Sequence, residues 1–442
     1  MSYRNAPIHP FLRFVFLLLR TISWAGTLVF YRKRTVLGRQ HLRFDGPAII
    51  VVNHPSTLLD VLNTCIYIRQ EPFFLANYSL FKHPISNWLL RRLFSIPVKR
   101  REDVAAGEDR NNDAAFEQSF DHVAKKGVLF IAAEGVSWME RWVRPFKTGA
   151  ARIAFGAENR NNWQLGVKII PVGLSYSAPD LFRSEVIVQF GSPVLLEDWA
   201  SREKTNHEQA VLDFTTALEN NVRALVLDTR DHTGQVFMEQ LEGILQNKFP
   251  ARSPAAYFAF RKKLITDNID DSVLKSDTEA YCAALQSAQL TDQGLFGCAT
   301  PSPADPFKNG LLLLAGLPFF SVGYAFWWLP CYLPWLVTQK LDLYIGYNST
   351  VKLLIGLFTF PMALWAAFRL AADGLGQEYW GWMGMGMAVL LGYFTEKYLD
   401  TARRWRERND AKILKKKDES LFLALLQQRQ AIVERACSRF IH

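Results

Sequence analysis

The sequence predicts an α/β domain with a largely buried sheet, followed by a helical region and by helices that contact a membrane. Short apolar runs rich in β-branched residues alternate with helix-length stretches in the first half of the chain, a pattern typical of an α/β domain. Long runs without charged residues follow nearer the end. A chain of 442 residues also exceeds the usual size of one domain, so further regions are expected.

Residues 1–34 are predicted to contact the membrane. The apolar stretch from about Pro10 to Arg34 is punctuated by arginines and ends in Arg-Lys-Arg, which suits a helix lying in the membrane interface. No small-residue cleavage site is evident, so we expect this segment to be retained. The alternative interpretation is an amphipathic helix buried in a soluble core.

Residues 35–200 are the predicted α/β domain, and residues 201–305, which are polar with helical periodicity, are a predicted helical accessory region. Phe73–Leu93 mixes aromatic and basic side chains, and two interpretations stay open: a segment against lipid headgroups, or a plain helix with a core face and a surface face. The clearest strands of the domain are Ala48–Val52, Val128–Ile131, Val167–Val172 and Val186–Phe190.

Residues 306–398 are predicted to form membrane segments, because about 20 apolar helical residues cross the hydrocarbon core. Asp373, Gly374 and Gly376 predict a tight turn between two helices of a hairpin. The three runs without charge are Leu311–Val337, Leu353–Phe368 and Tyr379–Thr395.

The first of these runs contains three prolines, which interrupt helical hydrogen bonding. We therefore expect a broken, in-plane or re-entrant element there, with the hairpin alone crossing the bilayer. An even number of crossings would leave the α/β domain and the end of the chain on the same face.

Residues 399–442 are predicted to be a basic, then amphipathic, helical tail. Eight basic residues between Arg403 and Lys417 are opposed only by Glu407 and Asp410, and the whole chain carries a formal net charge of +9. Because this basic run directly follows apolar segments, it indicates anionic lipid and not nucleic acid as the partner. We expect the tail and the catalytic domain on the cytoplasmic face, in a bacterial inner membrane more than in an intracellular eukaryotic one.

The cysteines indicate neither a disulfide framework nor a zinc site, because they are scattered without a C-x-x-C pair or a histidine at metal-ligand spacing. We expect no metal and no cofactor. The five cysteines are Cys65, Cys282, Cys298, Cys331 and Cys437.

A candidate catalytic motif, Asn53 to Asp60, directly follows the first clear strand. Ligands of open α/β sheets bind at the carboxyl ends of the strands. Neutral imidazole is suited to take a proton from an attacking alcohol. His54 would be that imidazole. A carboxylate on its other ring nitrogen would fix the tautomer, and Asp60 is the nearest candidate. The alternative is a buried structural histidine with one hydrogen bond.

Five blocks in order make the chain resemble the glycerophosphate acyltransferase superfamily over about residues 45–195. The resemblance implies a mixed sheet flanked by helices. The blocks are Asn53-His54 with Asp60, Ile96 to Asp103, Glu134 to Ser137, Arg144 to Arg152, and Ile169 to Gly173.

The resemblance also implies roles for single residues. His54 would be the general base and Asp60 its orienting carboxylate, while Arg100 would bind the acceptor phosphate through its guanidinium fork. Glu134 and Gly135 would help to position the acceptor or shape its loop. Lys147 and Thr148 would contact the phosphate or the donor, and they are equally compatible with solvated loop positions. The remaining candidates are Glu134, Gly135, Ser137, Lys147 and Thr148.

Two departures from the family pattern stand out. Five residues separate His54 from Asp60 where four are usual, and one residue turns a helix by about 100°. Contact between the two side chains therefore requires the additional residue to lie in the turn around Pro55 and not in the helix. The second departure is that no arginine follows the Glu-Gly pair, so phosphate binding would depend on Arg100 and Lys147.

The function that the resemblance implies is transfer of a fatty acyl group from acyl-CoA or acyl carrier protein to glycerol-3-phosphate or 1-acylglycerol-3-phosphate, with dihydroxyacetone phosphate or another lysolipid also open as acceptor. Acyl carrier protein is then a possible partner. One alternative is a serine lipid hydrolase using Ser56 or Ser137, although neither lies in a G-x-S-x-G elbow. Another is a lipid-binding scaffold without catalysis.

Overall fold

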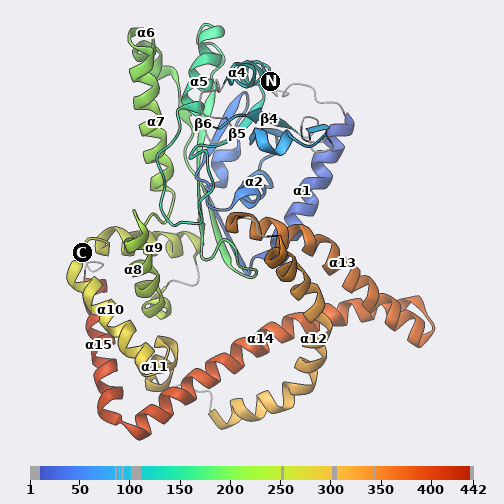
Figure 1. Ribbon diagram of the computed structural model, residues 1–442, viewed down its shortest axis with the longest axis vertical. Helices are drawn as coiled ribbons and strands as arrows, with labels where there is room; N and C mark the ends of the chain where they lie inside the picture. Colours follow the sequence, from blue (N-terminus) through green and yellow to red (C-terminus); the bar gives the residue numbers. More distant parts are fainter. Residues whose placement is uncertain are drawn as a thin grey trace. The chain divides into compact units, whose positions relative to one another are not determined.

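The computed structural model describes residues 10–84, 87–88, 90, 94–100, 111–249, 253–300, 306–341 and 344–438 (Figure 1). Contacts within the chain divide it into two compact units. The first unit comprises residues 1–230 together with residues 343–350, and the second comprises residues 231–342 and 351–442. Each unit is described by itself below.

Eight strands of the described residues form one sheet in the first unit, in the order β1-β7-β6-β2-β5-β3-β4, with β8 beside β6. Strands β6, β2, β5, β3 and β4 run parallel, whereas β7 and β8 are antiparallel to β6, and β1 is parallel to β7. This mixed, helix-flanked sheet confirms the predicted fold class. The strands are β1 (Lys33–Leu37), β2 (Ala48–Val52), β3 (Pro72–Asn77), β4 (Ser95–Val98), β5 (Val128–Ala132), β6 (Lys168–Tyr176), β7 (Glu185–Phe190) and β8 (Val194–Leu195).

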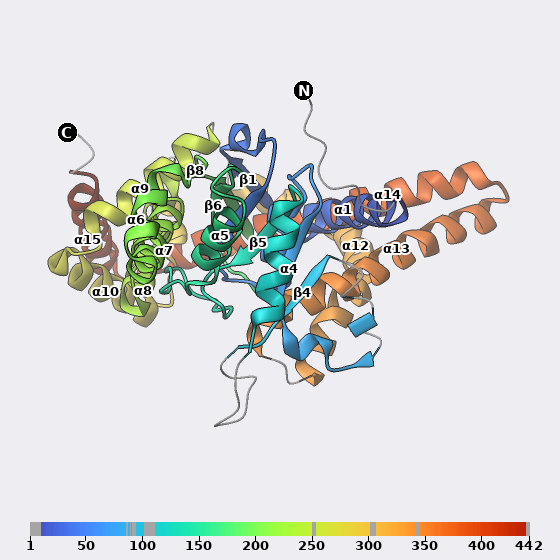
Figure 2. The same ribbon diagram turned by 90° about the horizontal axis from the view of Figure 1, so that it is seen from above.

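Helices cover both faces of the sheet (Figures 1 and 2). Alternate side chains of a strand point to opposite faces, and every residue of β2 is fully buried, as expected of a central strand between two helical layers. Ile49 and Val51 face the layer of α4 (Asp113–Ala124), α5 (Gly149–Arg160) and α7 (His207–Ala224). Helices α1 (Pro10–Phe30) and α2 (Thr57–Cys65) contact each other on the other side.

The stretch after α2 differs from the plain helix that was one interpretation of Phe73–Leu93, while its place against lipid headgroups stays a prediction. Its first residues form strand β3, and Phe73 and Leu75 pack against the core. A helix over these residues is therefore wrong, because alternate side chains of 72–77 are taken up by sheet packing. Residues 85–86, 89 and 91–93 lie outside the described residues. The short helices of this unit are η1 (Arg39–Leu42), η2 (Tyr78–Phe81), η4 (Glu197–Trp199), α6 (Ala200–Thr205) and η6 (Ile345–Tyr347).

Helix α1 is long and apolar enough to cross a membrane. Its Phe16 and Phe30 are buried, but most of its large apolar side chains are exposed, including Phe11 and Phe14 at more than 60%. This exposure contradicts the alternative of a helix buried in a soluble core.

Helix α12 (Pro306–Lys340) runs unbroken through Pro318, Pro330 and Pro334, and it curves along its length in Figure 1. The expectation of a broken element is therefore wrong. Prolines bend a helix when neighbouring groups take up the freed carbonyls, and Thr359 donates one such bond to the Pro330 carbonyl at 3.2 Å. The helix is long and apolar enough to cross a membrane.

Helices α13 (Asn348–Leu375) and α14 (Glu378–Lys417) form the predicted hairpin. Gly376 adopts a φ of 74° in the connecting turn, a conformation that favours glycine. The two helices approach so closely that a Cβ on Gly384 would lie 2.5 Å from the Ala371 Cβ. Residues 345–375 are long and apolar enough to cross a membrane, and α14 continues without a break into the basic stretch.

A bundle of helices completes the second unit, and its interior contains charged pairs beside buried apolar side chains. Arg429 is 5% exposed and donates to Asp292 at 2.8 Å and to the Ile244 carbonyl at 2.6 Å, while Arg261 donates to Glu242 at 2.7 Å. The helices are α8 (His232–Ile244), η5 (Gln246–Lys248), α9 (Pro254–Asn268), α10 (Ser272–Ser287), α11 (Asp292–Ala299) and α15 (Glu419–Ser438).

Candidate active site

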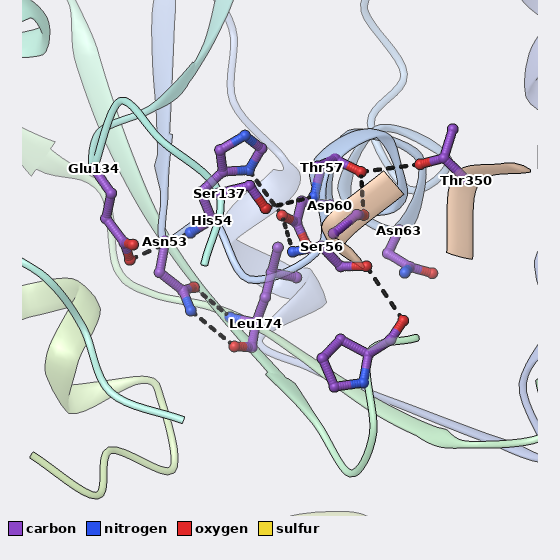
Figure 3. Close-up of polar contacts among 12 residues, drawn as sticks. Asn53, His54, Ser56, Thr57, Asp60, Asn63, Glu134, Ser137, Leu174 and Thr350 are labelled. Atoms are coloured by element: carbon purple, nitrogen blue, oxygen red, sulfur yellow. Dashed lines mark hydrogen bonds and ion pairs between the residues drawn. The ribbon is translucent and has the colours of Figure 1, made fainter. Parts of the chain in front are cut away.

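The turn after β2 places His54 at the carboxyl edge of the parallel strands (Figure 3). Asn53 anchors this turn, because its amide group donates to the Leu174 carbonyl at 2.9 Å and accepts from the Leu174 N–H at 2.8 Å. Both bonds are buried in the sheet. The position of the histidine backbone is thus tied to the neighbouring strand β6.

His54 and Asp60 are in direct contact, as predicted. The Nδ1 of the imidazole lies 2.8 Å from Oδ2 of the carboxylate. The Asp60 side chain is fully buried, whereas the His54 side chain is 12% exposed, so the ring is not sealed in the interior. Because a carboxylate only accepts, the contact requires a proton on Nδ1, and a neutral imidazole in this tautomer has its lone pair on Nε2.

The additional residue between His54 and Asp60 lies in the turn and not in the helix, as the contact required. Helix α2 begins only at Thr57, and this threonine has a φ of 42°, in the left-handed region. That conformation costs a β-branched residue roughly 1–2 kcal/mol. It also brings the Ser56 N–H within 2.8 Å of Oδ2 of Asp60.

Two tyrosines and an asparagine support the carboxylate from the interior. Tyr176 on β6 donates to the second oxygen of Asp60 at 2.7 Å, and Asn63 donates to the hydroxyls of Tyr176 and Tyr31 at 3.2 and 3.1 Å. Burial raises the pKa of Tyr176 well above its usual value, so the hydroxyl keeps its proton and donates it.

Glu134 lies beside His54, at the end of β5. Its Oε1 accepts from the His54 N–H at 3.3 Å, and the side chain is 7% exposed. Burial raises the pKa of Glu134 to about 8, so most of this carboxyl is protonated near neutral pH. Gly135 follows with a φ of 77°, and a Cβ there would lie 3.2 Å from the Lys147 side chain. The Glu-Gly pair thus shapes a tight loop under Lys147.

Ser137 and Ser56 both hold the turn together. The Oγ of Ser137 accepts from the Thr57 N–H at 3.0 Å and is 5% exposed. The Oγ of Ser56 lies 3.4 Å from the Pro179 carbonyl and 3.1 Å from the Ser349 hydroxyl. Both hydroxyls are engaged in the packing of the turn and not with His54, whose Nδ1 is bound to Asp60. This arrangement does not favour a serine nucleophile.

The family model for acyltransferases matches residues 33–175, which include His54, Asp60, Arg100, Glu134 and Lys147. The chain therefore contains an acyltransferase domain of the glycerophosphate acyltransferase superfamily.

Two proteins of Saccharomyces cerevisiae resemble this acyltransferase domain and its surroundings. Glycerol-3-phosphate O-acyltransferase 1 is 23% identical over 192 residues, which cover 41% of this chain and 25% of that protein. Glycerol-3-phosphate O-acyltransferase 2 is 26% identical over 126 residues, which cover 28% of this chain and 17% of that protein. The chain thus spans a quarter or less of the length of these relatives.

A solved structure, the 1-acyl-sn-glycerophosphate acyltransferase of Thermotoga maritima, is also similar to the chain. The superposition covers 47% of this chain and 80% of that one, with 20% identity and a TM-score of 0.34.

The cationic candidates of the acyltransferase domain lie along the carboxyl edge of the sheet. Arg100 follows β4 by two residues, and β4 and β2 run parallel with two strands between them. Three strand spacings separate their axes by about 14 Å. Lys147 is exposed, and its backbone N–H donates to the Ala133 carbonyl at 2.8 Å. Thr148 directly precedes α5. The substrate contacts of these residues stay predictions, and Arg101 to Asp103 of the basic block lie outside the described residues.

A segment from far along the chain completes the acyltransferase turn. Thr57 Oγ1 donates to the Gly346 carbonyl at 3.0 Å and lies 2.9 Å from the Thr350 hydroxyl, and Tyr344 donates to the Ser137 carbonyl at 3.0 Å. Residues 343–350 belong to the same compact unit as the turn. No local sequence pattern predicts this segment or Tyr176, whereas Asn63 could have been predicted as the residue one helical turn after Asp60.

Proposed function

We propose that the chain is a membrane-bound acyltransferase that moves a fatty acyl group from an acyl thioester to a hydroxyl of glycerol-3-phosphate or 1-acylglycerol-3-phosphate. The observation that carries this proposal is the 2.8 Å contact between His54 and a fully buried Asp60 at the carboxyl edge of an acyltransferase domain. The glycerol-phosphate activities named for the relatives support the choice of acceptor.

His54 is the general base in this proposal. The acceptor hydroxyl gives its proton to Nε2 as its oxygen attacks the thioester carbonyl carbon. The C–S bond then breaks, and the leaving thiolate takes the proton back from the imidazolium. Asp60 stabilises the imidazolium between these steps through the bond to Nδ1. Neither a metal ion nor a covalent acyl-enzyme is needed for these steps.

Arg100 and Lys147 are the proposed ligands of the acceptor phosphate. A guanidinium binds a phosphate through two parallel hydrogen bonds, and an ammonium adds a second charge. Both residues follow elements that end on the His54 edge of the sheet, Arg100 after β4 and Lys147 after the Glu-Gly loop. The loops around the acceptor phosphate would be shaped by Glu134, Gly135, Ser137 and Thr148.

The membrane, the donor and the compartment belong to the same proposal. Helices α1, α12 and α13, each long and apolar enough to cross a bilayer, would hold the enzyme at the membrane. The basic stretch at the end of α14 would face the cytoplasm, in a bacterial inner membrane. Acyl-CoA or acyl carrier protein would present the thioester from the same side.

The decisive experiment is acyl transfer by His54→Ala in membranes, with a radiolabelled acyl thioester and a panel of acceptors. General-base catalysis contributes roughly 100- to 10,000-fold, so we expect a loss of that size with the protein still folded in the membrane. The control is His207→Ala, which removes an exposed imidazole on α7 of the same unit and should leave turnover unchanged.

The products of the same assay also separate the alternatives. Ester formation that depends on the acceptor supports the transferase. Release of free fatty acid without acceptor indicates a hydrolase, and full activity of His54→Ala removes the proposed base.

A further inference from the structure

A basic cavity lies on the first unit, apart from the His54 site. Its volume is about 960 Å³, and its walls come from α1, from η1 with the residues after it, and from the turn after α2. Four arginines line it, while Asp45 supplies the one carboxylate among the lining residues. The arginines are Arg20, Arg39, Arg43 and Arg69.

The guanidinium groups of this cavity are available for an anion. Within the described part of the chain, no carboxylate forms an ion pair with any of the four. Arg20 is oriented by the bond from its Nε to the Ile66 carbonyl at 3.0 Å, and Arg39 by its position 4.7 Å above the Tyr67 ring. Arg43 and Arg69 are exposed. A ligand carrying a phosphate would therefore find charged donors that no internal carboxylate occupies.

Gln70 also lines the cavity. Gln70 donates through Nε2 to the Phe44 carbonyl at 3.0 Å, which directs its amide group. Its Oε1 is buried and has no hydrogen-bond partner among the described residues. Because this oxygen is buried, a ligand in the cavity does not reach it, and the arginines provide the charged contacts of the site.

The cavity is remote from the proposed catalytic base. Strand β1 runs antiparallel to β2, so η1, which follows β1, lies at the opposite edge of the sheet from His54. The turn after α2 leads to the start of β3 at that same edge. The length of a five-residue strand, about 17 Å, thus separates the two sites, which is too far for the phosphate of a reacting glycerol phosphate.

The wall formed by α1 indicates which phosphate compound the cavity takes. Leu17 and Trp24 line the cavity and are 48% and 49% exposed, on a helix long and apolar enough to cross a membrane. A ligand beside them would have its phosphate at the guanidinium groups and apolar chains along α1. We propose that this cavity binds the phosphate group of an anionic phospholipid, at a site separate from catalysis.

The test compares the full-length Arg43→Gln/Arg69→Gln variant with wild type in neutral detergent micelles. Binding of phosphatidylglycerol, phosphatidylcholine and inorganic phosphate is measured by native mass spectrometry. Since charged hydrogen bonds are lost, we expect at least a tenfold weaker binding of phosphatidylglycerol to the variant. The matched control is Arg202→Gln/Lys204→Gln, which removes the same charge from α6 of the same unit. Arg43→Lys/Arg69→Lys should restore part of the affinity.

Each outcome decides the proposal. The proposal is supported if phosphatidylglycerol binds more weakly to the Arg43→Gln/Arg69→Gln variant but with wild-type affinity to the Arg202→Gln/Lys204→Gln control. The proposal is overturned if both variants bind phosphatidylglycerol equally weakly, because the affinity then depends only on the net charge of the protein. Equal binding of phosphatidylcholine, or displacement of the lipid by millimolar inorganic phosphate, overturns it as well, since a soluble phosphate site would then explain the cavity.

Discussion

Asp60 connects the candidate base to the interior of the domain. It is fully buried and accepts hydrogen bonds from His54, from the Ser56 N–H and from Tyr176. A buried carboxylate without such donors would be strongly destabilising, because it has lost its hydration. The three donors also orient the carboxylate, so that Oδ2 faces the imidazole while Oδ1 is held by the tyrosine. The same bonds therefore stabilise the fold and set the tautomer of His54.

Glu134→Gln tests the environment of the second motif carboxyl. Burial raises the pKa of Glu134 to about 8, so the folded protein holds a proton that the unfolded chain releases above about pH 4.5. The stability of the wild type should therefore fall as the pH rises from about 4.5 to 8, whereas glutamine has no proton to lose. We expect the free energy of unfolding of the variant to exceed that of the wild type at pH 8 by an amount on the order of a few kcal/mol.

Thermal unfolding at pH 5 and at pH 8 measures this difference. At pH 5 the two proteins should unfold at nearly the same temperature, because Glu134 is protonated in the folded state and partly so in the unfolded chain. If the unfolding temperatures of the wild type and the variant differ by the same amount at pH 5 and at pH 8, the raised pKa of Glu134 is contradicted.

At the scale of elements, the catalytic turn is held from two sides. The left-handed Thr57 is unfavourable by itself, yet its N–H and its hydroxyl are both bonded, to Ser137 and to Gly346. Strained backbone persists only where the surrounding structure determines it. The segment of residues 344–350 is therefore part of what keeps His54 and Asp60 in contact across five intervening residues.

Ser349→Ala/Thr350→Val should loosen this turn without changing its volume much. Each hydrogen bond to Ser56 or Thr57 contributes about 1 kcal/mol, so two together correspond to a fall in kcat of about tenfold or more, with a smaller change in KM. Steady-state acyl transfer in membranes measures both constants.

The control for this variant removes the same two groups elsewhere. Ser321→Ala/Thr359→Val deletes hydroxyls whose bonds run to the Leu317 and Pro330 carbonyls of α12. This control should keep wild-type kcat. If both double variants lose activity equally, the segment has no particular role in the turn.

The central elements could be predicted from the sequence because burial leaves a local pattern. The runs that form β2, β5, β6 and β7 are continuous and apolar, as strands in the middle of a sheet require. Strands β1 and β4 lie at the two edges, and because β1 begins with two basic residues and β4 contains a proline, no continuous run of β-branched residues marks them. The prediction for α12 was wrong for another reason: prolines break a helix in isolation, whereas here the Thr359 hydroxyl of α13 takes up the Pro330 carbonyl that Pro334 frees.

The residues of the candidate active site also divide into those that local sequence predicts and those that it does not. His54, Asp60 and Glu134 fall in short motifs next to strand ends, so sequence reasoning found them. Tyr176 and the segment of residues 344–350 reach the motif only through folding, more than 100 residues away along the chain, and no local spacing records such contacts.

At the scale of the whole molecule, the chain consists of two compact units with separate cores. The first unit is built on the sheet and its buried apolar strands, whereas the helical bundle of the second encloses charged groups together with its buried apolar side chains. Arg429 is the clearest of these, since its guanidinium bridges Asp292 and the end of α8 and lies 4.3 Å from the Phe296 ring. Damage to this group should therefore affect the second unit first.

Arg429→Met tests this separation. Removing the arginine leaves Asp292 without its charged partner and the Ile244 carbonyl without a donor, and breaking a buried pair in this way costs roughly 3–5 kcal/mol. Hydrogen exchange followed by mass spectrometry should show lost protection in α10, α11 and α15 while β2 and β5 keep theirs.

Arg404→Met, which removes an exposed arginine from α14, is the control and should change the protection of neither unit. Loss of protection in β2 equal to that in α15 would mean that the two units unfold as one, because only a shared cooperative transition carries the damage from the bundle to the sheet.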